Sequence, residues 1–514
     1  MTAPFDHDGS LASSVASEYR LSRLAAAILW LFIGYIAVST ISLFLPAFLS
    51  IPFGYELNYN EGWNIYNTAR LINHEIIYDN NFWRVNNYPI GSFLIIAGVN
   101  YLFHDLLLSG RLVAAISFLA IGVLTGAATR RFGGDWADTV FGGVCALGFC
   151  YLMAPGWVAV DDPQSLAEAI MLSGFVSYIS RPADHLGLLR TALLVVSAGF
   201  VKHNLLAIPL AITFDLALRS PRDLRFWLWS CAGATTALLA LTYIIAGGAF
   251  IAHLLSPRIF SWERVRHNFM KYLRLFKFPL LAMIPFLPTI FPRDRRVLAA
   301  YGLLSVVIAA IFSGFEGTSY NMFQDAAAFL GIAAGVLLHE TRKRIASASG
   351  GSLTKVIALA AVPVMLAQPI WAKSLAAFDR LYNIRDFLAA GHRDENAFSA
   401  EITFIAARPG PAICESLLMC YRAGKPFILD PFNSRQYLLA GKLDENELVR
   451  RVASHEFAVV QIRGDICDDP ATGYCHILHY EQKVARFTDQ FLYAVNRYYK
   501  IGWRSEKGIL YVPK

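Results

Sequence analysis

Apolar residues occur in long, nearly uncharged runs over most of the chain. The runs from Leu24 to Pro46 and from Phe226 to Gly247 contain no charged residue, and about 20 apolar residues are enough to cross a bilayer. This pattern predicts a polytopic α-helical membrane protein. We expect about eleven spans, near residues 24–46, 111–128, 137–155, 164–180, 187–201, 203–218, 226–247, 276–291, 297–312, 322–338 and 353–371.

Basic residues between these runs predict the orientation of the chain. With the N-terminus in the cytoplasm, nearly all basic loops fall on the cytoplasmic side, as the positive-inside rule requires. These loops contain Arg130-Arg131, Arg181, Arg219 to Arg225, Arg293 to Arg296 and Arg342 to Arg344. The assignment holds only if the short apolar stretch 89–106, which Gly and Asn interrupt, does not span. A stretch of this length is typical of a re-entrant or interfacial segment.

The residues after about position 372 follow a different pattern. They have ordinary charge density, β-rich runs at 458–462 and 509–512, and a helical pattern at 445–452, which together predict a small α/β or α+β domain. We therefore expect the chain to have three parts. They are a cytoplasmic tail (1–23), a transmembrane domain (24–371, with an outer loop at 47–110 that contains interfacial helices) and a soluble periplasmic domain (372–514).

Composition supports this division and narrows the classes of partner. The chain is 56% hydrophobic and 16% charged, whereas soluble domains carry roughly 25% charged residues. Its net charge of +7 resides in short loops next to apolar runs, which is not a nucleic-acid signature. Membrane lipid is the expected environment, and no nucleic acid is expected as a partner.

Four of the seven cysteines lie in the predicted soluble domain. They are Cys414, Cys420, Cys467 and Cys475, and an even number in a non-cytoplasmic domain predicts disulfides. Pairs 414–420 and 467–475 are the simplest arrangement, although three connectivities are possible. The chain has no Asn-x-Ser/Thr sequon, which favours the periplasmic side of a bacterial inner membrane over an ER lumen.

The first outer loop contains candidate chemistry around Glu61. Residues 63–76 have apolar positions at helical spacing and predict an amphipathic helix in the membrane interface, with Arg70 on it and Tyr88-Pro89 beyond it. Glu61 stands at the start of this helix. Its carboxylate is either a helix cap, stabilised by the dipole, or an ionised group at the water–lipid boundary that acts as a base or holds a cation.

Further polar residues are predicted on the same outer face. Asp161-Asp162-Pro163 precedes a span, and helix capping accounts for only one of the two carboxylates. Lys202 interrupts an apolar run and either snorkels to the interface or binds a phosphate anion.

Two more outer segments carry candidate binding residues. Segment 251–275 is basic, and its Arg258 and Arg264 either hold a lipid-linked phosphate or contact anionic headgroups. Asn321 and Asp325 lie one helical turn apart at the start of a span, where polar groups are expected to face the protein interior.

Polar residues that gather at one boundary favour an enzyme at the outer leaflet. A transporter or flippase for a lipid-linked saccharide would place its polar residues near the midplane and show repeats with broken helices. A non-catalytic scaffold would tolerate replacement of Glu61 and Asp162. Convergence of Glu61, Asp162 and Lys202 on one outward cavity would favour the enzyme, and separations beyond about 15 Å would weaken it, because no hydrogen-bonded site could then include all three.

These motifs resemble those of the GT-C glycosyltransferases that use polyprenyl-phosphate sugars, in the branch with protein O-mannosyltransferases and the aminoarabinose transferase of lipid A. The resemblance covers roughly residues 20–340, and the tail more weakly. It rests on Tyr59-Asn60-Glu61-Gly62, Tyr88-Pro89-Ile90, Asp161-Asp162-Pro163, Lys202, and Asn321 with Asp325. The chain departs from the pattern in having Asn60-Glu61 where many relatives have Asp-Glu, in lacking a second Pro after Tyr88, and in the order Asp-Asp-Pro.

The resemblance implies an inverting transfer of a hexose or pentose from a polyprenyl-phosphate donor to a glycolipid, glycan or protein acceptor. Glu61 would be the general base, and Lys202 and Arg264 would hold the leaving phosphate. Asp162 would assist the acceptor. Some relatives use a divalent cation such as Mg or Mn, which Glu61 and Asp162 would hold here. Tyr88, Arg258, Arg70, Asn321 and Asp325 would complete the substrate site.

Overall fold

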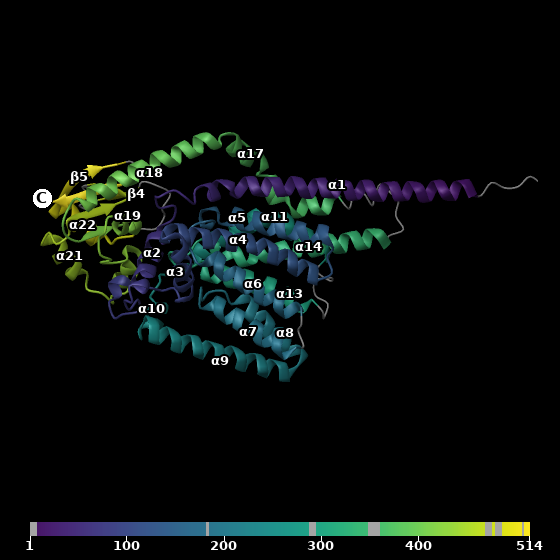
Figure 1. The fold of residues 1–514 in the computed structure, drawn as a ribbon, viewed down its shortest axis with the longest axis horizontal. Helices are drawn as coiled ribbons and strands as arrows, with labels where there is room; N and C mark the ends of the chain where they lie inside the picture. The colour runs from purple at the N-terminus through teal and green to yellow at the C-terminus, as the bar shows by residue number, and fades with distance from the viewer. Residues whose placement is uncertain are drawn as a thin grey trace, which may run out of the picture.

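Long helices that run along the longest axis of the molecule form its main body (Figure 1). The computed structural model describes residues 8–180, 184–286, 295–347, 360–467, 475–478, 486–505 and 508–514. The bundle contains α1 (Asp8–Leu49), α4 (Leu106–Arg131), α5 (Trp136–Met153), α6 (Gln164–Ser180), α7 (His185–Gly199), α8 (Ala207–Arg219), α9 (Pro221–Ala246), α11 (Trp262–Met283), α13 (Arg296–Phe312) and α14 (Gln324–Ser347).

The bundle is that of a multi-pass membrane protein. Five stretches within the described residues are long and apolar enough to cross a bilayer, namely Leu24–Leu49, Leu106–Arg131, Trp136–Met153, Pro221–Ala246 and Tyr320–Ile345. Each predicted span up to 322–338 overlaps a described helix. The last predicted span, 353–371, falls partly outside the described residues, which resume at 360 and include α16 (Gln368–Trp371).

One predicted span differs from the observed helix. We expected a span at 276–291, but α11 begins at Trp262 and has a kink at Phe276, three residues before Pro279. Proline removes a backbone donor and clashes with the preceding turn, which accounts for the kink. Residues 287–291 of the predicted span lie outside the described part. The basic segment before the kink thus belongs to the same helix as the apolar segment after it.

Small residues allow the central helices to pack closely. A Cβ atom at Gly331 of α14 would lie 2.5 Å from the Ala146 Cβ of α5, and one at Gly142 of α5 would lie 3.0 Å from the Gly331 carbonyl oxygen. Such contacts let the backbones of membrane helices approach each other. Ala326, Ala327 and Ala328 of α14 are also fully buried.

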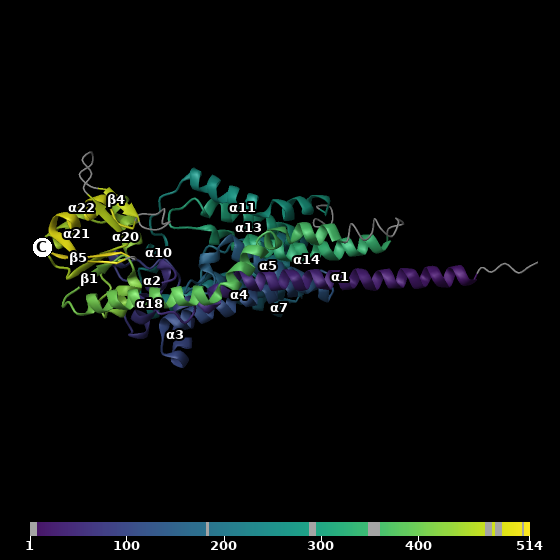
Figure 2. The ribbon, with the colours of Figure 1, turned by 90° about the horizontal axis from the view of Figure 1, so that it is seen from above.

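The apolar stretch 89–106 forms the short helix α3 (Gly91–Phe103). Thirteen residues of α-helix extend only about 20 Å, less than the roughly 30 Å of a hydrocarbon core. Figure 2 shows α3 projecting sideways from the bundle, and its Tyr101 and Leu102 are 79% and 77% exposed. α3 is therefore shorter than a span, and its place in the membrane interface stays a prediction.

The last turns of α4 and α14 lie at the end of the bundle remote from the C-terminus (Figure 1), and they carry Arg130, Arg131 and Arg344. Arg295 bonds Glu340 and the Phe132 carbonyl oxygen there, and Arg342 bonds Asp135 and Asp138. Clusters that the sequence assigned to one side of the membrane are therefore neighbours in space.

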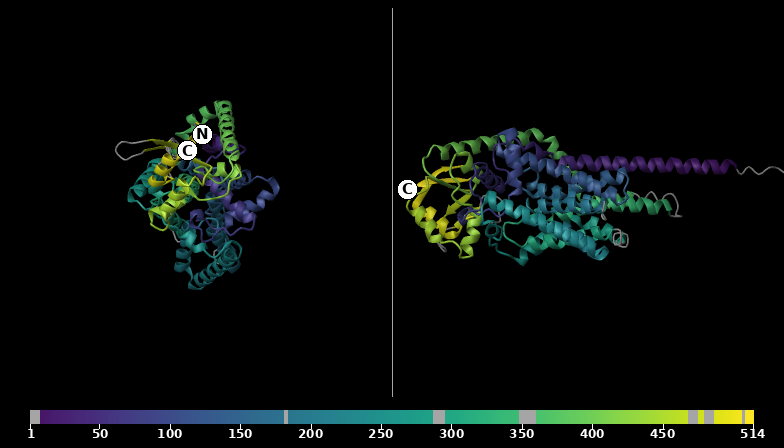
Figure 3. Two further views of the ribbon diagram at one scale, coloured as in Figure 1. Left: turned by 90° about the vertical axis from the view of Figure 1, so that its left-hand side faces the viewer. Right: turned by 60° about the horizontal axis from the view of Figure 1, so that its bottom comes forward.

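A smaller α/β unit covers the other end of the bundle, joined to it by α17 (Ser374–Tyr382) and α18 (Ile384–Ala406) (Figures 1 and 3). Its sheet has the order β1-β2-β6-β5, with β1 and β2 parallel and the other pairs antiparallel. The strands are β1 (Ala412–Cys414), β2 (Val459–Ile462), β5 (Tyr499–Arg504) and β6 (Ile509–Pro513), beside a hairpin of β3 (Gly464–Cys467) and β4 (Cys475–Leu478). Its helices are α19 (Leu417–Arg422), α20 (Pro431–Leu439), α21 (Glu445–Ala453) and α22 (Asp489–Tyr498).

The predicted elements of this unit are present. Strands β2 and β6 and helix α21 lie where the β-rich runs and the helical pattern placed them. A disulfide joins Cys414 to Cys420, as the simplest pairing predicts. In the hairpin, Cys467 is the backbone partner of Cys475, but their side chains fall outside what the structure describes, so the second disulfide stays a prediction.

The helix predicted in the first outer loop is α2 (Tyr59–Ile72), and it is buried in protein instead of lying in the interface. Helix α19 packs directly on it, because a Cβ atom at Gly62 would clash with the backbone nitrogen of Leu418. The sequence predicted an apolar face on this helix, but it contained no sign that the C-terminal unit covers that face. α2 thus connects the bundle with that unit.

Candidate active site

Asp162 and Lys202 form a buried ion pair at the end of the bundle beneath the C-terminal unit. Lys202 Nζ lies 3.1 Å from Asp162 Oδ1, and Lys202 and Asp162 are 3% and 4% exposed. The loop between α7 and α8 holds Lys202, and the turn before α6 holds Asp162. Lys202 also faces the rings of Tyr88, at 5.1 Å, and Trp157, at 6.0 Å. Burial lowers the pKa of the Lys202 ammonium, against the opposite effect of Asp162.

The other oxygen of Asp162 faces the first outer loop. Asn60 Nδ2 donates a hydrogen bond to Asp162 Oδ2 at 2.8 Å, and the Tyr88 hydroxyl lies 3.4 Å from the same oxygen. Asp162 also caps α6, since the Gln164 amide donates to Oδ1 at 2.9 Å. Helix capping therefore explains Asp162, the residue we had considered for catalysis, and the same carboxylate also joins three loops.

Glu61 occupies a different environment from the one predicted. Its carboxylate is fully buried and receives Arg111 Nε at 2.6 Å and Arg111 Nη2 at 2.8 Å. It also accepts from the backbone amides of Leu57, Asn58 and Asp161. The Asn58–Glu61 pair forms a complete capping box at the start of α2. These partners fix the carboxylate in place and give it a structural role at the start of α2, and its role as general base stays a prediction.

Asp161 lies between these two groups and is 1% exposed. Neither of its carboxylate oxygens has a hydrogen-bond partner among the described residues. Burial raises the pKa of Asp161, and the charges of Glu61 and Asp162 raise it further. Asp161 therefore favours its neutral form.

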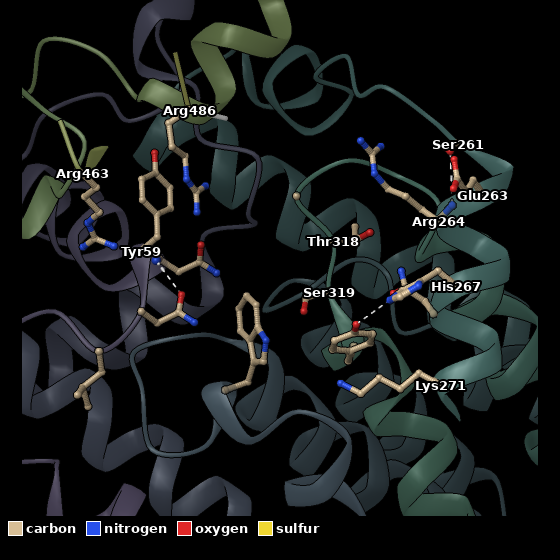
Figure 4. Close-up of a pocket in the computed structure, with 17 residues that line it drawn as sticks. Tyr59, Ser261, Glu263, Arg264, His267, Lys271, Thr318, Ser319, Arg463 and Arg486 are labelled. Atoms are coloured by element: carbon tan, nitrogen blue, oxygen red, sulfur yellow. Dashed lines mark hydrogen bonds between the residues drawn. The ribbon is translucent and has the colours of Figure 1, made fainter. Parts of the chain in front are cut away.

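A cavity of about 940 Å³ opens beside the Asp162–Lys202 pair. Asn60 and Trp157, which contact the pair, form part of its wall. Segments from the first outer loop, from α11, from the turn before η4 (Tyr320–Phe323) and from the C-terminal unit form the rest (Figure 4). Basic side chains outnumber acidic ones in this wall. Among the described lining residues, Glu263 is the single carboxylate, whereas Arg264, Lys271, Arg463 and Arg486 are basic. The cavity therefore favours an anionic ligand.

Helix α11 presents three of the polar lining residues on one face. Arg264, His267 and Lys271 recur at spacings of three and four residues and point into the cavity (Figure 4). Arg264 Nη2 lies 3.8 Å from Glu316 Oε1, and Lys271 Nζ lies 3.1 Å from the centre of the Tyr320 ring. Arg264 stands in the first turn, where the helix dipole disfavours a cation and favours an anion. This position is unfavourable for the helix but suits a phosphate.

Arg258 is placed behind the cavity rather than in it. Its guanidinium donates to the Glu316 carbonyl oxygen and to Asn433 Oδ1, both at 3.1 Å, and lies 4.8 Å from the centre of the Phe432 ring. Burial lowers its pKa, against the effects of Tyr88 and Asp430. The structure thus gives Arg258 a contact between the α10–α11 loop, where α10 is Phe250–Leu254, and the C-terminal unit.

Three other predicted site residues do not reach the cavity. Arg70 pairs with Glu75 at 3.2 Å and Asp79 at 2.8 Å, at the opposite end of α2, so its predicted role in substrate binding is not supported. Asp325 lies inside the bundle, where Tyr301 donates to it and Glu168 is its neighbour. Asn321 is buried next to the lining residue Tyr320, and its side-chain oxygen has no partner among the described residues.

The residues do not fit a divalent cation at Glu61 and Asp162. Arg111 occupies the first carboxylate and Lys202 the second. In the part of the chain that the structure describes, no three His, Cys, Asp or Glu side chains come together in a way that could hold a metal ion. We derive no step through a metal.

Several residues of the site had not been singled out from the sequence. Arg463 and Arg486 come from the soluble unit, and no motif marks them. Arg111 stands at the start of a predicted span, where a charged residue is itself a sign of function or of a buried partner. Asn60 was part of the quoted motif but had been given no role of its own. In the structure it lines the cavity and donates a hydrogen bond to Asp162.

Comparison with known proteins places this arrangement in a known fold. No family model and no curated protein matches the sequence. Among solved structures, the chain is similar to ArnT from Cupriavidus metallidurans bound to undecaprenyl phosphate, with a TM-score of 0.54 and 13% identity over 94% of this chain and 97% of that one. For the apo state of ArnT, the TM-score is 0.57 and the identity 14%, over 95% and 98% of the two chains.

A second similar structure is the Archaeoglobus fulgidus oligosaccharyltransferase tethered with an acceptor peptide. Its TM-score is 0.51 and its identity 10%, over 94% of this chain and 79% of that one. Both proteins belong to the GT-C superfamily. The chain has the GT-C fold. The GT-C resemblance inferred from the short motifs is therefore confirmed at the level of the fold, and the match extends beyond residue 340 into the C-terminal unit.

Proposed function

We propose that this GT-C chain is an inverting glycosyltransferase that moves a sugar from a polyprenyl-phosphate donor to an envelope acceptor at the outer face of the membrane. The observation that carries the proposal is the cavity in which basic residues of α11 face a wall joined to Asp162 through Asn60. ArnT, whose fold the chain shares, has been seen with undecaprenyl phosphate bound. That ligand has the same chemistry as the leaving group we propose.

Arg264 and Lys271 are the residues we assign to the donor phosphate. They extend from a helix that continues into the bundle, so a phosphate between them stays at the level where a polyprenyl chain enters the lipid. During transfer the phosphate gains a negative charge as the bond to the sugar breaks. Cations in place before the reaction stabilise that charge without reorganisation.

Asp162 is the group we assign as general base, in place of Glu61. The donors to its Oδ2 are the side chains of Asn60 and Tyr88, which can give way to an acceptor, whereas backbone amides and Arg111 fix the Glu61 carboxylate. The acceptor hydroxyl or amine attacks the anomeric carbon from the face opposite the phosphate. The bond between the anomeric carbon and the phosphate oxygen breaks with its electron pair on that oxygen, and the acceptor proton passes to Asp162, directly or through one water. Asn60 and Lys202 hold Asp162 in position. Glu61 acts as a positioning residue, because with Arg111 it fixes the loop on which Asn60 stands.

Two features support the outer face as the place of reaction. Basic loops gather at the end of the bundle opposite the cavity, as expected for a cytoplasmic side. A disulfide lies in the unit that covers the cavity, and structural disulfides persist mainly in oxidising compartments. The acceptor would then be a lipid, glycan or protein of the cell envelope.

Lipids from a strain that lacks the gene provide the test, because such a strain accumulates both donor and unmodified acceptor. The purified full chain is incubated with this extract, and mass spectrometry follows both molecules. We expect the polyprenyl-phosphate sugar to disappear and the acceptor to gain the mass of one sugar. A flippase would leave every mass unchanged, and that result would overturn the proposal.

A further inference from the structure

The cavity carries basic side chains on two opposite walls. Arg264, His267 and Lys271 stand on the α11 side, while Arg463 and Arg486 stand across the cavity beside Tyr59 (Figure 4). Arg463 follows β2 and Arg486 precedes α22, so both belong to the C-terminal unit. The two groups thus come from different parts of the fold.

The second group lines the cavity and also has contacts inside the protein. Arg486 stacks on the ring of Tyr59, with its guanidinium carbon 3.7 Å from the ring centre. Its Nε is buried and has no hydrogen-bond partner among the described residues. Arg463 pairs with Glu56 at 2.9 Å, but burial raises the pKa of Glu56 to about 7. Arg463 also faces Glu415 and Glu401, and Arg486 faces Asp430. The second group is therefore available to a ligand through its place in the cavity wall.

A single donor cannot use both walls. The phosphodiester of a polyprenyl-phosphate sugar carries one negative charge, and its lipid chain keeps that charge near the bundle, where α11 begins. Arg463 and Arg486 belong to the unit that covers the cavity from the soluble side (Figure 1). A second anion that approaches from that side would meet them first.

We infer that Arg463 and Arg486 bind an acidic group of the acceptor, so that this enzyme glycosylates an anionic acceptor that carries a phosphate ester or a carboxylate. Arginine binds either group through two parallel hydrogen bonds, and the Tyr59 ring holds the Arg486 guanidinium in place by a cation–π contact. This inference rests on the proposed function and adds the chemical class of the acceptor.

Isothermal titration of the full chain in detergent tests the inference. The probes are inorganic phosphate and acetate, each at constant ionic strength and in the presence of saturating farnesyl phosphate, a short polyprenyl phosphate that occupies the α11 wall. We expect the small anion to bind the protein already loaded with farnesyl phosphate. The tighter of the two anions identifies the acidic group.

Substitutions on each wall then assign the anions. Arg486→Gln and Arg463→Gln are expected to weaken the small anion about tenfold to hundredfold, the value of a charge-assisted hydrogen bond, and to leave farnesyl phosphate bound as before. Arg264→Gln is expected to weaken the binding of farnesyl phosphate and to leave the binding of the small anion unchanged. Arg450→Gln, an exposed arginine of the same unit outside the cavity, is the matched control and should change neither.

Two results would overturn the inference. One is that farnesyl phosphate excludes the small anion and that both bind more weakly in Arg486→Gln, which would make the two walls a single donor site. The other is that neither probe responds to Arg463→Gln or Arg486→Gln. If the wild type does not bind farnesyl phosphate at all, the proposed function itself fails, so the two failures are distinguishable.

Discussion

Glu61 illustrates how a residue in a familiar motif can have a structural role. The resemblance suggested a base, and loss of a general base typically lowers turnover by about 10²–10⁴-fold while the protein stays folded. Its buried pair with Arg111 and its three backbone donors indicate another function. Removal of one partner from such a pair leaves an uncompensated buried charge.

We therefore expect Glu61→Gln to lower the stability of the protein by about 3–5 kcal/mol. Thermal denaturation of the purified variant in detergent measures this loss. Glu263→Gln, the same change at an exposed site in the cavity wall, is the control and should melt like the wild type. A Glu61→Gln protein with unchanged melting and abolished turnover would restore Glu61 as the base.

Asp162→Asn is expected to lower turnover by about 10²–10⁴-fold. The variant also leaves Lys202 buried without its carboxylate, so a loss of stability has to be separated from a loss of chemistry. The double variant Asp162→Asn/Lys202→Met removes both charges and should regain stability but not turnover. Recovery of sugar transfer in the double variant would show that Asp162 acts only through the fold.

Glu56 predicts a pH dependence of stability. Burial raises the pKa of Glu56 from 4.5 to about 7, and the charge of Glu61 also raises it. Arg463, the Ser416 hydroxyl and Arg486 lower this pKa, but by less than burial raises it. Between about pH 4.5 and 7, the folded protein therefore binds more protons than the unfolded chain, and stability falls as pH rises through this window. Melting temperatures from pH 5 to 8 should fall less steeply in Glu56→Gln, and parallel curves would contradict the assignment.

At the scale of elements, helix α2 connects the first outer loop to the C-terminal unit. Asn60 and Glu61 stand in its first turn, and α19 packs on the backbone at Gly62. Contacts on both sides therefore set the position of Asn60. Burial by α19 could not be read from the local sequence, since an apolar face fits a lipid interface and a protein partner equally well.

Gly62→Ala is expected to push α2 and α19 apart, because the added Cβ would clash with the Leu418 backbone. Overpacking of this kind typically costs about 1–3 kcal/mol. Thermal denaturation measures the loss, and Gly98→Ala in α3, where nothing lies within 4 Å of the new Cβ, provides the control. Equal melting temperatures for the two variants would mean that α2 and α19 are not in fixed contact.

The spans and the soluble strands were predictable because they depend on local patterns. Runs of apolar residues give the bundle helices, and short β-rich runs give β2 and β6. Helix α11 was placed too late because its first half is basic, while the kink at Phe276 joins that half to the apolar part. The composition of a segment says little about which neighbouring segment continues it.

The site was predictable only in part, because its residues come from segments that lie far apart in the sequence. Asp162 and Lys202 stood out as charges next to apolar runs, and they do form a pair. Arg70 stood out equally but pairs with Glu75 and Asp79 elsewhere. Arg463 and Arg486 reach the cavity only because the C-terminal unit covers the bundle, which is a tertiary property without a local signal.

At the scale of the whole molecule, the fold sets one reaction space between two parts. The bundle supplies α11 and the Asp162–Lys202 pair, and the C-terminal unit supplies the opposite wall (Figure 4). This division suits a reaction between a lipid-linked donor and an acceptor from the soluble side.

The most direct test of the account is mass spectrometry of envelope lipids and glycans from cells that lack the gene and carry either the wild type or Asp162→Asn. The account predicts an acceptor heavier by one hexose or pentose with the wild type, and its absence with Asp162→Asn although that protein is present in the membrane. The same modified acceptor in both strains would contradict it.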